Sequence, residues 1–283
     1  MGAPLSRLAV DAGELAEGPW WDAAAGGLYW VDIPAGRVHF TSGDGGQRSW
    51  DAGQPVGAAV TRAGGGLVLA VRDGFMTLDP ATGATAMLAE VERDRPGNRM
   101  NDGACDQAGR FFAGTKSEDD EQGAGALYRL DPDGRVTRVI SGVTISNGLG
   151  WSPGERLMYY ADTPTGRVDV FDYDPATGSL ADRRRPFVTI DKPGASPDGL
   201  TVDAEGGVWV ALWGGSAVHR YTPDGRLDRV LDIPHVHVTS CAFGGPGLDT
   251  LYVTAAAGPG ADRGALYSCP AGVSGQPAHP YQG

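Results

Sequence analysis

Oxygen-bearing side chains stand directly before a glycine at four widely spaced points of the chain. They belong to Glu17, Asn101-Asp102, Asn147 and Asp198. Any one of them alone is typical of a turn, because Asn-Gly and Asp-Gly are common turn sequences. The Asn and Asp residues follow small or apolar residues, however, as expected in a strand. Taken together, the four positions therefore indicate a functional site rather than four ordinary turns.

Three of these side chains suit a cation. Glu17, Asn147 and Asp198 supply two carboxylates and one amide oxygen, a hard donor set that fits Ca²⁺, Mg²⁺ or Mn²⁺ better than structural zinc. With three protein ligands, the remaining positions belong to water or substrate, as in catalytic sites. An open metal site of this kind predicts hydrolysis.

An internal repeat explains how such distant residues could meet. A unit of short apolar strands, separated by Gly, Asp-Pro and Asp-Gly turns, recurs about every 44 residues. The six units begin at Gly18, Gly57, Asp102, Asn147, Asp198 and Thr239. Six four-stranded units of this length predict an all-β fold, a six-bladed β-propeller, in preference to a pair of β-sandwiches. The innermost strands of a propeller converge on one channel, which would bring the unit starts together.

The repeat leaves no room for a linker, so we expect one domain over residues 1–283. A propeller must close its ring, and we expect both the first strand, at 7–13, and the tail ending in HPYQG to lie in the closing blade. The acidic segment 117–125 is expected to be a loop between two strands of the third blade. Its role stays open.

The charge balance excludes several partners. The net charge is −12 and the isoelectric point about 4.7, so nucleic acid and anionic membranes would be repelled. No apolar stretch has the length of a membrane span, and the start lacks the apolar core of a secretion signal. Three widely spaced cysteines support neither a disulfide framework nor a zinc site. These features predict a cytoplasmic protein of undetermined oligomeric state.

Several longer strings carry a resemblance to a known family. They are AEGPWWD at 16–22, NRMNDGACDQAGRFFAGT at 98–115, SNGLGWS at 146–152, YYADTPTGRVDVFDYD at 159–174, PDGLTVDAEGGVWVA at 197–211 and VTSCAFGG at 238–245. In order and spacing they resemble the gluconolactonase, regucalcin and luciferin-regenerating-enzyme family over essentially the whole chain. The resemblance implies a six-bladed propeller that hydrolyses sugar lactones.

The same resemblance implies roles for individual residues. It implies one divalent metal on Glu17, Asn147 and Asp198, with Ca²⁺ as first choice and Zn²⁺, Mn²⁺, Mg²⁺ or Fe²⁺ as alternatives. The substrate would be held by Arg99 and Asn101. The family has a further substrate contact from an acidic residue, which here would be Glu118 or Asp119. The loop that carries them differs in sequence from the corresponding loop of the family's animal members.

Lactone hydrolysis requires a polarised carbonyl, a nucleophilic water and a protonated leaving oxygen. Asp198 is the expected general base. Arg99 and Asn101 suit the oxygens of a polyol ring. Two alternatives remain: a metal-dependent propeller hydrolase of another ester or of a phosphotriester, and a non-catalytic calcium-binding propeller. The presence of both Arg99 and Asn101 argues against the second.

The sequence does not identify the lactone. Arg99 is the one basic residue expected at the mouth, beside several carboxylates. On that ground, and because the net charge is −12, neutral lactones are expected to be better substrates than lactones with a free carboxylate.

Overall fold

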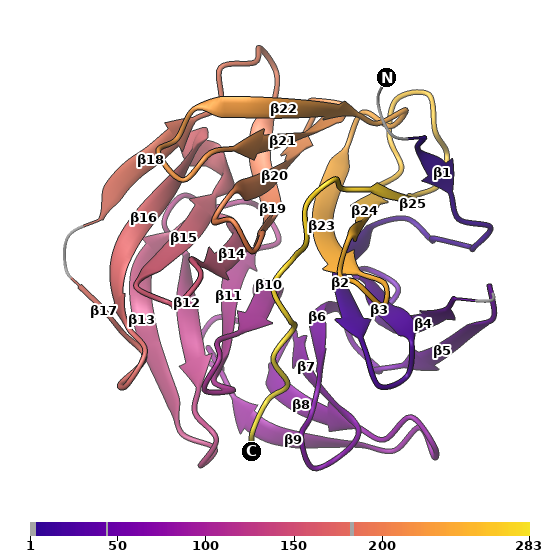
Figure 1. Ribbon diagram of the computed structural model, residues 1–283. Helices are drawn as coiled ribbons and strands as arrows, with labels where there is room; N and C mark the ends of the chain where they lie inside the picture. The colour runs from indigo at the N-terminus through magenta and orange to yellow at the C-terminus, as the bar shows by residue number, and fades with distance from the viewer. Residues whose placement is uncertain (1–3, 44, 182–183) are drawn as a thin grey trace.

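Six antiparallel sheets form the described part of the chain, residues 4–43, 45–181 and 184–283 of a computed structural model. Figure 1 shows them arranged radially around a common centre, so the predicted all-β, six-bladed propeller is confirmed. The helical structure within these residues is a single 3₁₀ turn, η1 (Thr163–Thr165). None of the helical structure described has the length and apolar character needed to cross a bilayer. The cytoplasmic location stays a prediction.

Each blade runs outward from an inner strand. The first three blades comprise β2 (Ala16–Asp22), β3 (Gly27–Asp32), β4 (Arg37–Ser42) and β5 (Gln47–Asp51); β6 (Val56–Thr61), β7 (Leu67–Val71), β8 (Gly74–Leu78) and β9 (Thr85–Glu90); and β10 (Asn98–Cys105), β11 (Phe111–Ser117), β12 (Gly125–Leu130) and β13 (Val136–Val143). The acidic segment is thus the loop between β11 and β12, as predicted.

The last three blades repeat the pattern with two variations. They comprise β14 (Ser146–Trp151), β15 (Leu157–Asp162), β16 (Arg167–Asp174), β17 (Ser179–Leu180) and β18 (Arg185–Thr189); β19 (Ser196–Val202), β20 (Val208–Trp213), β21 (Ala217–Tyr221) and β22 (Leu227–Asp232); and β23 (Val238–Gly244), β24 (Thr250–Ala255), β25 (Ala265–Pro270) and β1 (Ser6–Arg7). In the fourth blade both β17 and β18 pair with β16.

The core lies between neighbouring blades. Val31, Ala58, Leu69, Phe75 and Phe111 come from the first three blades and pack in one cluster, each at most 1% exposed. Both faces of these short strands are covered by the next blade, so the strands are apolar throughout rather than alternating. Burial of each large side chain contributes about 1.5–3 kcal/mol to this stacking.

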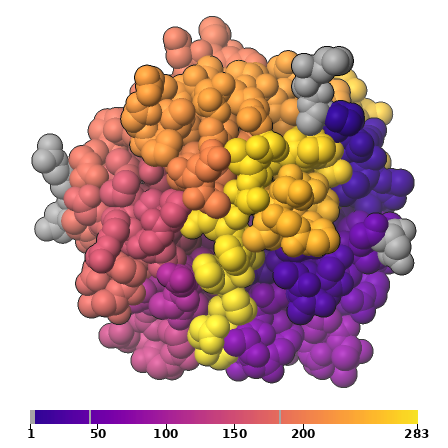
Figure 2. Space-filling model, viewed as in Figure 1, coloured from indigo at the N-terminus to yellow at the C-terminus, as the bar shows by residue number. Residues whose placement is uncertain are grey.

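The two chain ends take different routes. β1 is the outer strand of the sixth blade, paired with β25, so the first strand lies in the closing blade as predicted. It covers only Ser6–Arg7, however, and the prediction of a strand over 7–13 is wrong in its extent. The tail does not join that blade, so this part of the prediction is wrong. It crosses the face turned toward the viewer in Figures 1 and 2. There Tyr281 bonds to the backbone of Thr61 and Ala63 of the second blade.

The tail takes this route because inner-strand ends on several blades leave backbone groups that it can satisfy. Gln282 N donates to Gly109 O beside the third blade, and Gln276 Nε2 donates to Trp151 O of the fourth blade. The tail therefore ties blades together across the channel end. Because β1 also closes the last blade, we propose that the chain folds as one domain.

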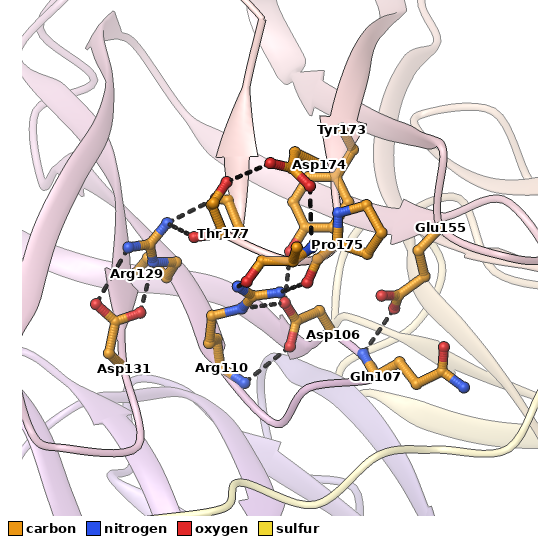
Figure 3. A network of polar contacts seen from close by, with 12 residues as sticks. Asp106, Gln107, Arg110, Arg129, Asp131, Glu155, Tyr173, Asp174, Pro175 and Thr177 are labelled. Carbon is orange, nitrogen blue, oxygen red and sulfur yellow. Dashed lines mark hydrogen bonds and ion pairs between the residues drawn. The ribbon is translucent and has the colours of Figure 1, made fainter.

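A buried polar network joins the third and fourth blades (Figure 3). Arg110 lies in the turn after β10 and pairs with the fully buried Asp106, Nε to Oδ2 2.5 Å. The Arg110 guanidinium also donates to Pro175 O, in the turn after β16. Tyr173 of β16 donates its hydroxyl to Asp106. These bonds fix the angle between two blades that carry parts of the site.

Candidate active site at the start of the inner strands

Every inner strand has a register irregularity near its beginning. The shifts lie between Glu17 and Trp20, Val56 and Ala58, Met100 and Asp102, Ser146 and Leu149, Pro197 and Leu200, and Val238 and Ser240. A β-bulge redirects side chains at that point and is common beside active sites. Here it turns the residues before the recurring glycines toward the channel axis.

The recurring glycines allow neighbouring inner strands to approach closely. A Cβ on Gly148 would lie 2.5 Å from Leu200 N and 2.6 Å from Asp198 O. A Cβ on Gly57 would lie 2.7 Å from the backbone carbonyl of Asn101. All three distances are shorter than a van der Waals contact, and backbone atoms cannot move aside. The glycines therefore belong to the channel wall, and the preceding residues lie in strands rather than in turns.

Glu17 lies at the start of β2 with its carboxylate buried. Its side chain is 4% exposed, and Oε2 accepts a hydrogen bond from Gly18 N at 2.8 Å. Burial raises the pKa of Glu17 well above its usual range, and the charges of Asp198 and Asp102 raise it further. The carboxylate needs a cation nearby to stay ionised.

Asn147 is oriented by its neighbour Thr163 on η1. The Thr163 hydroxyl donates its one proton to Pro197 O at 2.9 Å. Its oxygen must therefore accept at the second contact, 2.9 Å from Asn147 Nδ2. This arrangement assigns the amide nitrogen to Thr163 and leaves Asn147 Oδ1 on the opposite side, without a hydrogen-bond partner.

Asp198 lies one blade further along, at the start of β19. It is 4% exposed, and its Oδ1 likewise has no hydrogen-bond partner. Burial raises the pKa of Asp198 well above its usual range, and the charge of Asp102 adds to this, while hydrogen bonds from the Asn147 side chain and from Gly199 N, and then the charge of Lys116, oppose it. Burial also raises the pKa of Asp102 to about 7. Three carboxylates thus repel one another in a buried space.

This donor set fits a divalent cation. A buried acceptor without a partner costs free energy, and the oxygens of Asn147 and Asp198 would both be satisfied by a cation beside Glu17. Within the described residues no three His, Cys, Asp or Glu side chains gather closely enough to form a metal site. A cation held by Glu17 and Asp198 would take the Asn147 amide oxygen as its third protein ligand.

Arg99 and Asn101 lie side by side on β10. Arg99 Nη1 donates to Asn101 Oδ1 at 2.8 Å and to Met100 O at 3.0 Å, and Asn101 Nδ2 donates to Ser146 O at 2.9 Å. Asn101 therefore orients Arg99 and connects it to the strand that carries Asn147. The amide oxygen and the amide nitrogen of Asn101 can each form one further hydrogen bond, which a ligand could use.

The acidic loop contributes Glu118 rather than Asp119. Glu118 Oε2 is 3.3 Å from Arg99 Nε, and Oε1 is 3.1 Å from Arg72 Nη2. Asp119 is exposed, and its backbone nitrogen donates to Ser117 Oγ. Glu118 thus connects the second and third blades at the mouth.

Two basic residues of the site were missed by the sequence analysis. Arg72 reaches Glu118, and Lys116 lies in register opposite Arg99 and pairs with Asp120. The expectation that Arg99 is the one basic residue at the mouth is therefore wrong.

A cavity of about 280 Å³ lies along the channel beyond the site. Gly18 and Asp102 line it near the proposed ion-binding residues, and 276–279 of the tail line its other end. The residues proposed to bind ion and substrate, namely Glu17, Arg99, Asn101, Glu118, Asn147 and Asp198, are absent from its lining. The site therefore opens at the end of the channel opposite to the tail.

Comparison with known proteins agrees with this geometry. Residues 15–257 match the family model "SMP-30/Gluconolactonase/LRE-like region". The chain belongs to this family. Among its members, regucalcin of Bos taurus is 36% identical over 292 residues, covering 94% of each chain. The putative sugar lactone lactonase YvrE of Bacillus subtilis is 37% identical, covering 86% of this chain and 83% of its own.

Solved structures of SMP-30/gluconolactonase-like proteins superpose over nearly the full length. A luciferin-regenerating enzyme gives a TM-score of 0.92 at 31% identity, covering 99% of this chain and 100% of that one. A regucalcin of Agrobacterium tumefaciens, described as a calcium-binding protein, gives 0.89 at 29% identity, covering 96% and 98%.

Proposed function

We propose that this protein hydrolyses sugar lactones with the help of one divalent cation. The observation that carries the proposal is the pair of buried, unpartnered oxygens of Asn147 and Asp198 beside Glu17. The family and the lactonase name of the B. subtilis relative support a lactone substrate. The calcium-binding description of the A. tumefaciens relative supports Ca²⁺ ahead of Zn²⁺, Mn²⁺, Mg²⁺ or Fe²⁺.

Glu17, Asn147 and Asp198 would hold the cation, which when bound would polarise the lactone carbonyl and lower the pKa of a water molecule. Asp198 then accepts a proton from the attacking water and returns it to the ring oxygen as the ester bond breaks. Arg99, held by Asn101 and Glu118, would donate hydrogen bonds to oxygens of the substrate. We also propose that nucleic acid is not a partner, because the net charge is −12. The cytoplasmic location predicted from the sequence remains part of the proposal.

Removal and return of the cation test the proposal. Chelated protein should release no acid from a panel of aldonolactones, and addition of Ca²⁺ or another divalent ion should restore turnover. Full activity in protein shown by elemental analysis to be free of metal would exclude this mechanism. Turnover of aryl esters or phosphotriesters without lactone turnover would favour another hydrolase. Cation binding without any turnover would indicate a non-catalytic calcium-binding protein.

Asp198→Asn separates the proton-transfer role from substrate binding. It should lower kcat by about 10²–10⁴-fold, the usual contribution of a general base. Asn101→Ala should act mainly on KM, because it loosens Arg99 without touching the reacting atoms. Both variants are assayed with their cation content measured. Wild-type kcat in cation-loaded Asp198→Asn would assign the base to another group.

A further inference from the structure

Two cations face each other across the first two strands of the third blade. Arg99 of β10 and Lys116 of β11 are direct partners in the antiparallel register. Side chains at such positions share a face of the sheet, with Cβ atoms about 4.5–5.5 Å apart. Like charges placed in this way repel each other. The pair is stable only with anions close by.

The cations are largely buried and the acids that form ion pairs with them are exposed, while the buried carboxylates of Glu17 and Asp198 attract them from further away. The side chains of Arg99 and Lys116 are 8% and 13% exposed. Their partners Glu118 and Asp120, at 44% and 55%, lie on the loop after β11. Ion pairs with exposed acids contribute little, because water solvates the acid almost equally well. An anion brought by a ligand can therefore take the place of these acids at small cost.

The cation pair lies next to the proposed ion-binding residues. Lys116 forms a backbone bridge with Ile145, two residues before Asn147. Within the described residues, Nη2 of Arg99 has no hydrogen-bond partner, while its other two nitrogens are engaged. A guanidinium nitrogen is thus available at the mouth, with an ammonium group on the same face of the sheet.

We propose that Arg99 and Lys116 form an anion-binding subsite, and that the preferred substrate is a sugar lactone with an anionic group outside its ring. Arg99 would bind one oxygen of a carboxylate or phosphate through Nη2, and Lys116 would supply a second positive charge. Arg72, which reaches Glu118 from the second blade, adds positive charge at the rim. This inference rests on the proposed lactonase function and adds Lys116 as its specificity-determining residue.

The subsite reverses the expectation drawn from the net charge of −12. Charges separated by more than about 8 Å are largely screened at physiological ionic strength. The acids spread over the surface therefore act weakly on a bound ligand, whereas Arg99 and Lys116 would touch it. The positive charges of Arg99 and Lys116 therefore decide the preference between acidic and neutral lactones.

A matched pair of substrates provides the test. D-Glucaro-1,4-lactone and D-glucono-1,4-lactone differ only in the terminal carbon, a carboxylate in the first and a hydroxymethyl group in the second. The wild-type protein should show the higher kcat/KM with the glucarolactone, and the preference should decrease as salt is added. A lactone of a 6-phosphorylated aldonic acid distinguishes phosphate from carboxylate as the preferred anion.

Variants of Lys116 assign the preference to that residue. Lys116→Met keeps the length of the side chain and removes its charge, and it should lower the ratio of acidic to neutral kcat/KM about tenfold, mainly through KM. Lys116→Arg should retain the ratio. Lys192→Met removes the same charge from the loop before β19 and serves as the control, with an unchanged ratio.

The outcomes separate this inference from the proposed function. Hydrolysis of the neutral lactone with no preference for the acidic one, or with a preference that Lys116→Met leaves intact, would overturn the subsite and leave the lactonase function standing. Absence of turnover with both lactones and every cation would overturn both. Thermal unfolding of each variant identifies any loss of ratio that comes from misfolding.

Discussion

At the scale of single residues, the proposed cation binding depends on the orientation of the Asn147 amide. Asn147 presents Oδ1 rather than Nδ2 to the channel because Thr163 donates its own proton to Pro197 O. A flipped amide would direct two N–H groups at the position that a cation would occupy. Thr163 therefore controls the site without reaching it.

Thr163→Val tests this control. The substitution keeps the shape of the side chain and removes the acceptor for Asn147 Nδ2, so the affinity for Ca²⁺ should decrease about 10–100-fold, the usual effect of losing such a supporting bond. Calorimetric titration of chelated protein measures the affinity. Thr165→Val is the control, because Thr165 bonds to Asp162 O on the same 3₁₀ turn and not to Asn147. Equal affinities for the two variants would contradict the role of Thr163.

At the scale of the elements, the blades and the place of the proposed ligands at the starts of inner strands could be predicted, because both depend on local patterns. Gly, Asp-Pro and Asp-Gly turns define hairpins within a few residues, and the repeat places Glu17, Asn147 and Asp198 at equivalent positions. The contact between Lys116 and the site could not be predicted in the same way. It depends on the register of β10 with β11, and the irregularity between Met100 and Asp102 shifts that register.

The paths of the acidic loop and of the tail could not be predicted from local sequence patterns, for a related reason. Glu118 reaches Arg99 because the loop after β11 folds back over β10, which no residue of the loop encodes by itself. The tail is held by single backbone bonds to strand ends that are distant in sequence, such as that of Tyr281 to Thr61. Contacts of this kind have no periodicity, so the tail was placed in the wrong blade.

The polar network between the third and fourth blades gives a stability prediction. Asp106→Ala leaves Arg110 buried without its charge partner, which costs about 3–5 kcal/mol. For a chain of this size the melting temperature should decrease by roughly 10 °C, as measured by circular dichroism. Asp133→Ala is the control, because exposed Asp133 bonds only within its own turn, to Arg135 N. Similar melting temperatures for the two variants would show that the network is dispensable.

At the scale of the whole molecule, the channel concentrates negative charge that the fold must tolerate. The raised pKa values of Glu17, Asp102 and Asp198 mean that the folded state holds protons there that the unfolded chain has released. The stability from these protonated groups is fully present below about pH 4. It is lost as the pH rises through the pKa of about 7 of Asp102.

Chelated protein should therefore melt at a lower temperature at pH 8 than at pH 5. A divalent cation should raise the melting temperature most at pH 8, where the carboxylates are charged and bind it best. Asp102→Asn should flatten the pH dependence of the chelated protein. A chelated protein that becomes steadily more stable from pH 5 to pH 8 would show that the three carboxylates do not govern this dependence.

The glycines of the inner strands meet the packing requirement of the ring, whereas the residues before them supply the candidate ligands. Gly57 and Gly148 approach the backbone of the next strand and cannot carry a side chain. The residue before each glycine is under no such constraint: Glu17 and Asn147 precede theirs as candidate ligands, whereas the buried Val56 precedes Gly57. The glycine thus serves the packing of the ring, and the residue directly before it is available for a functional side chain. A designer can replace the ligand set, or add a donor at position 56, without redrawing the scaffold.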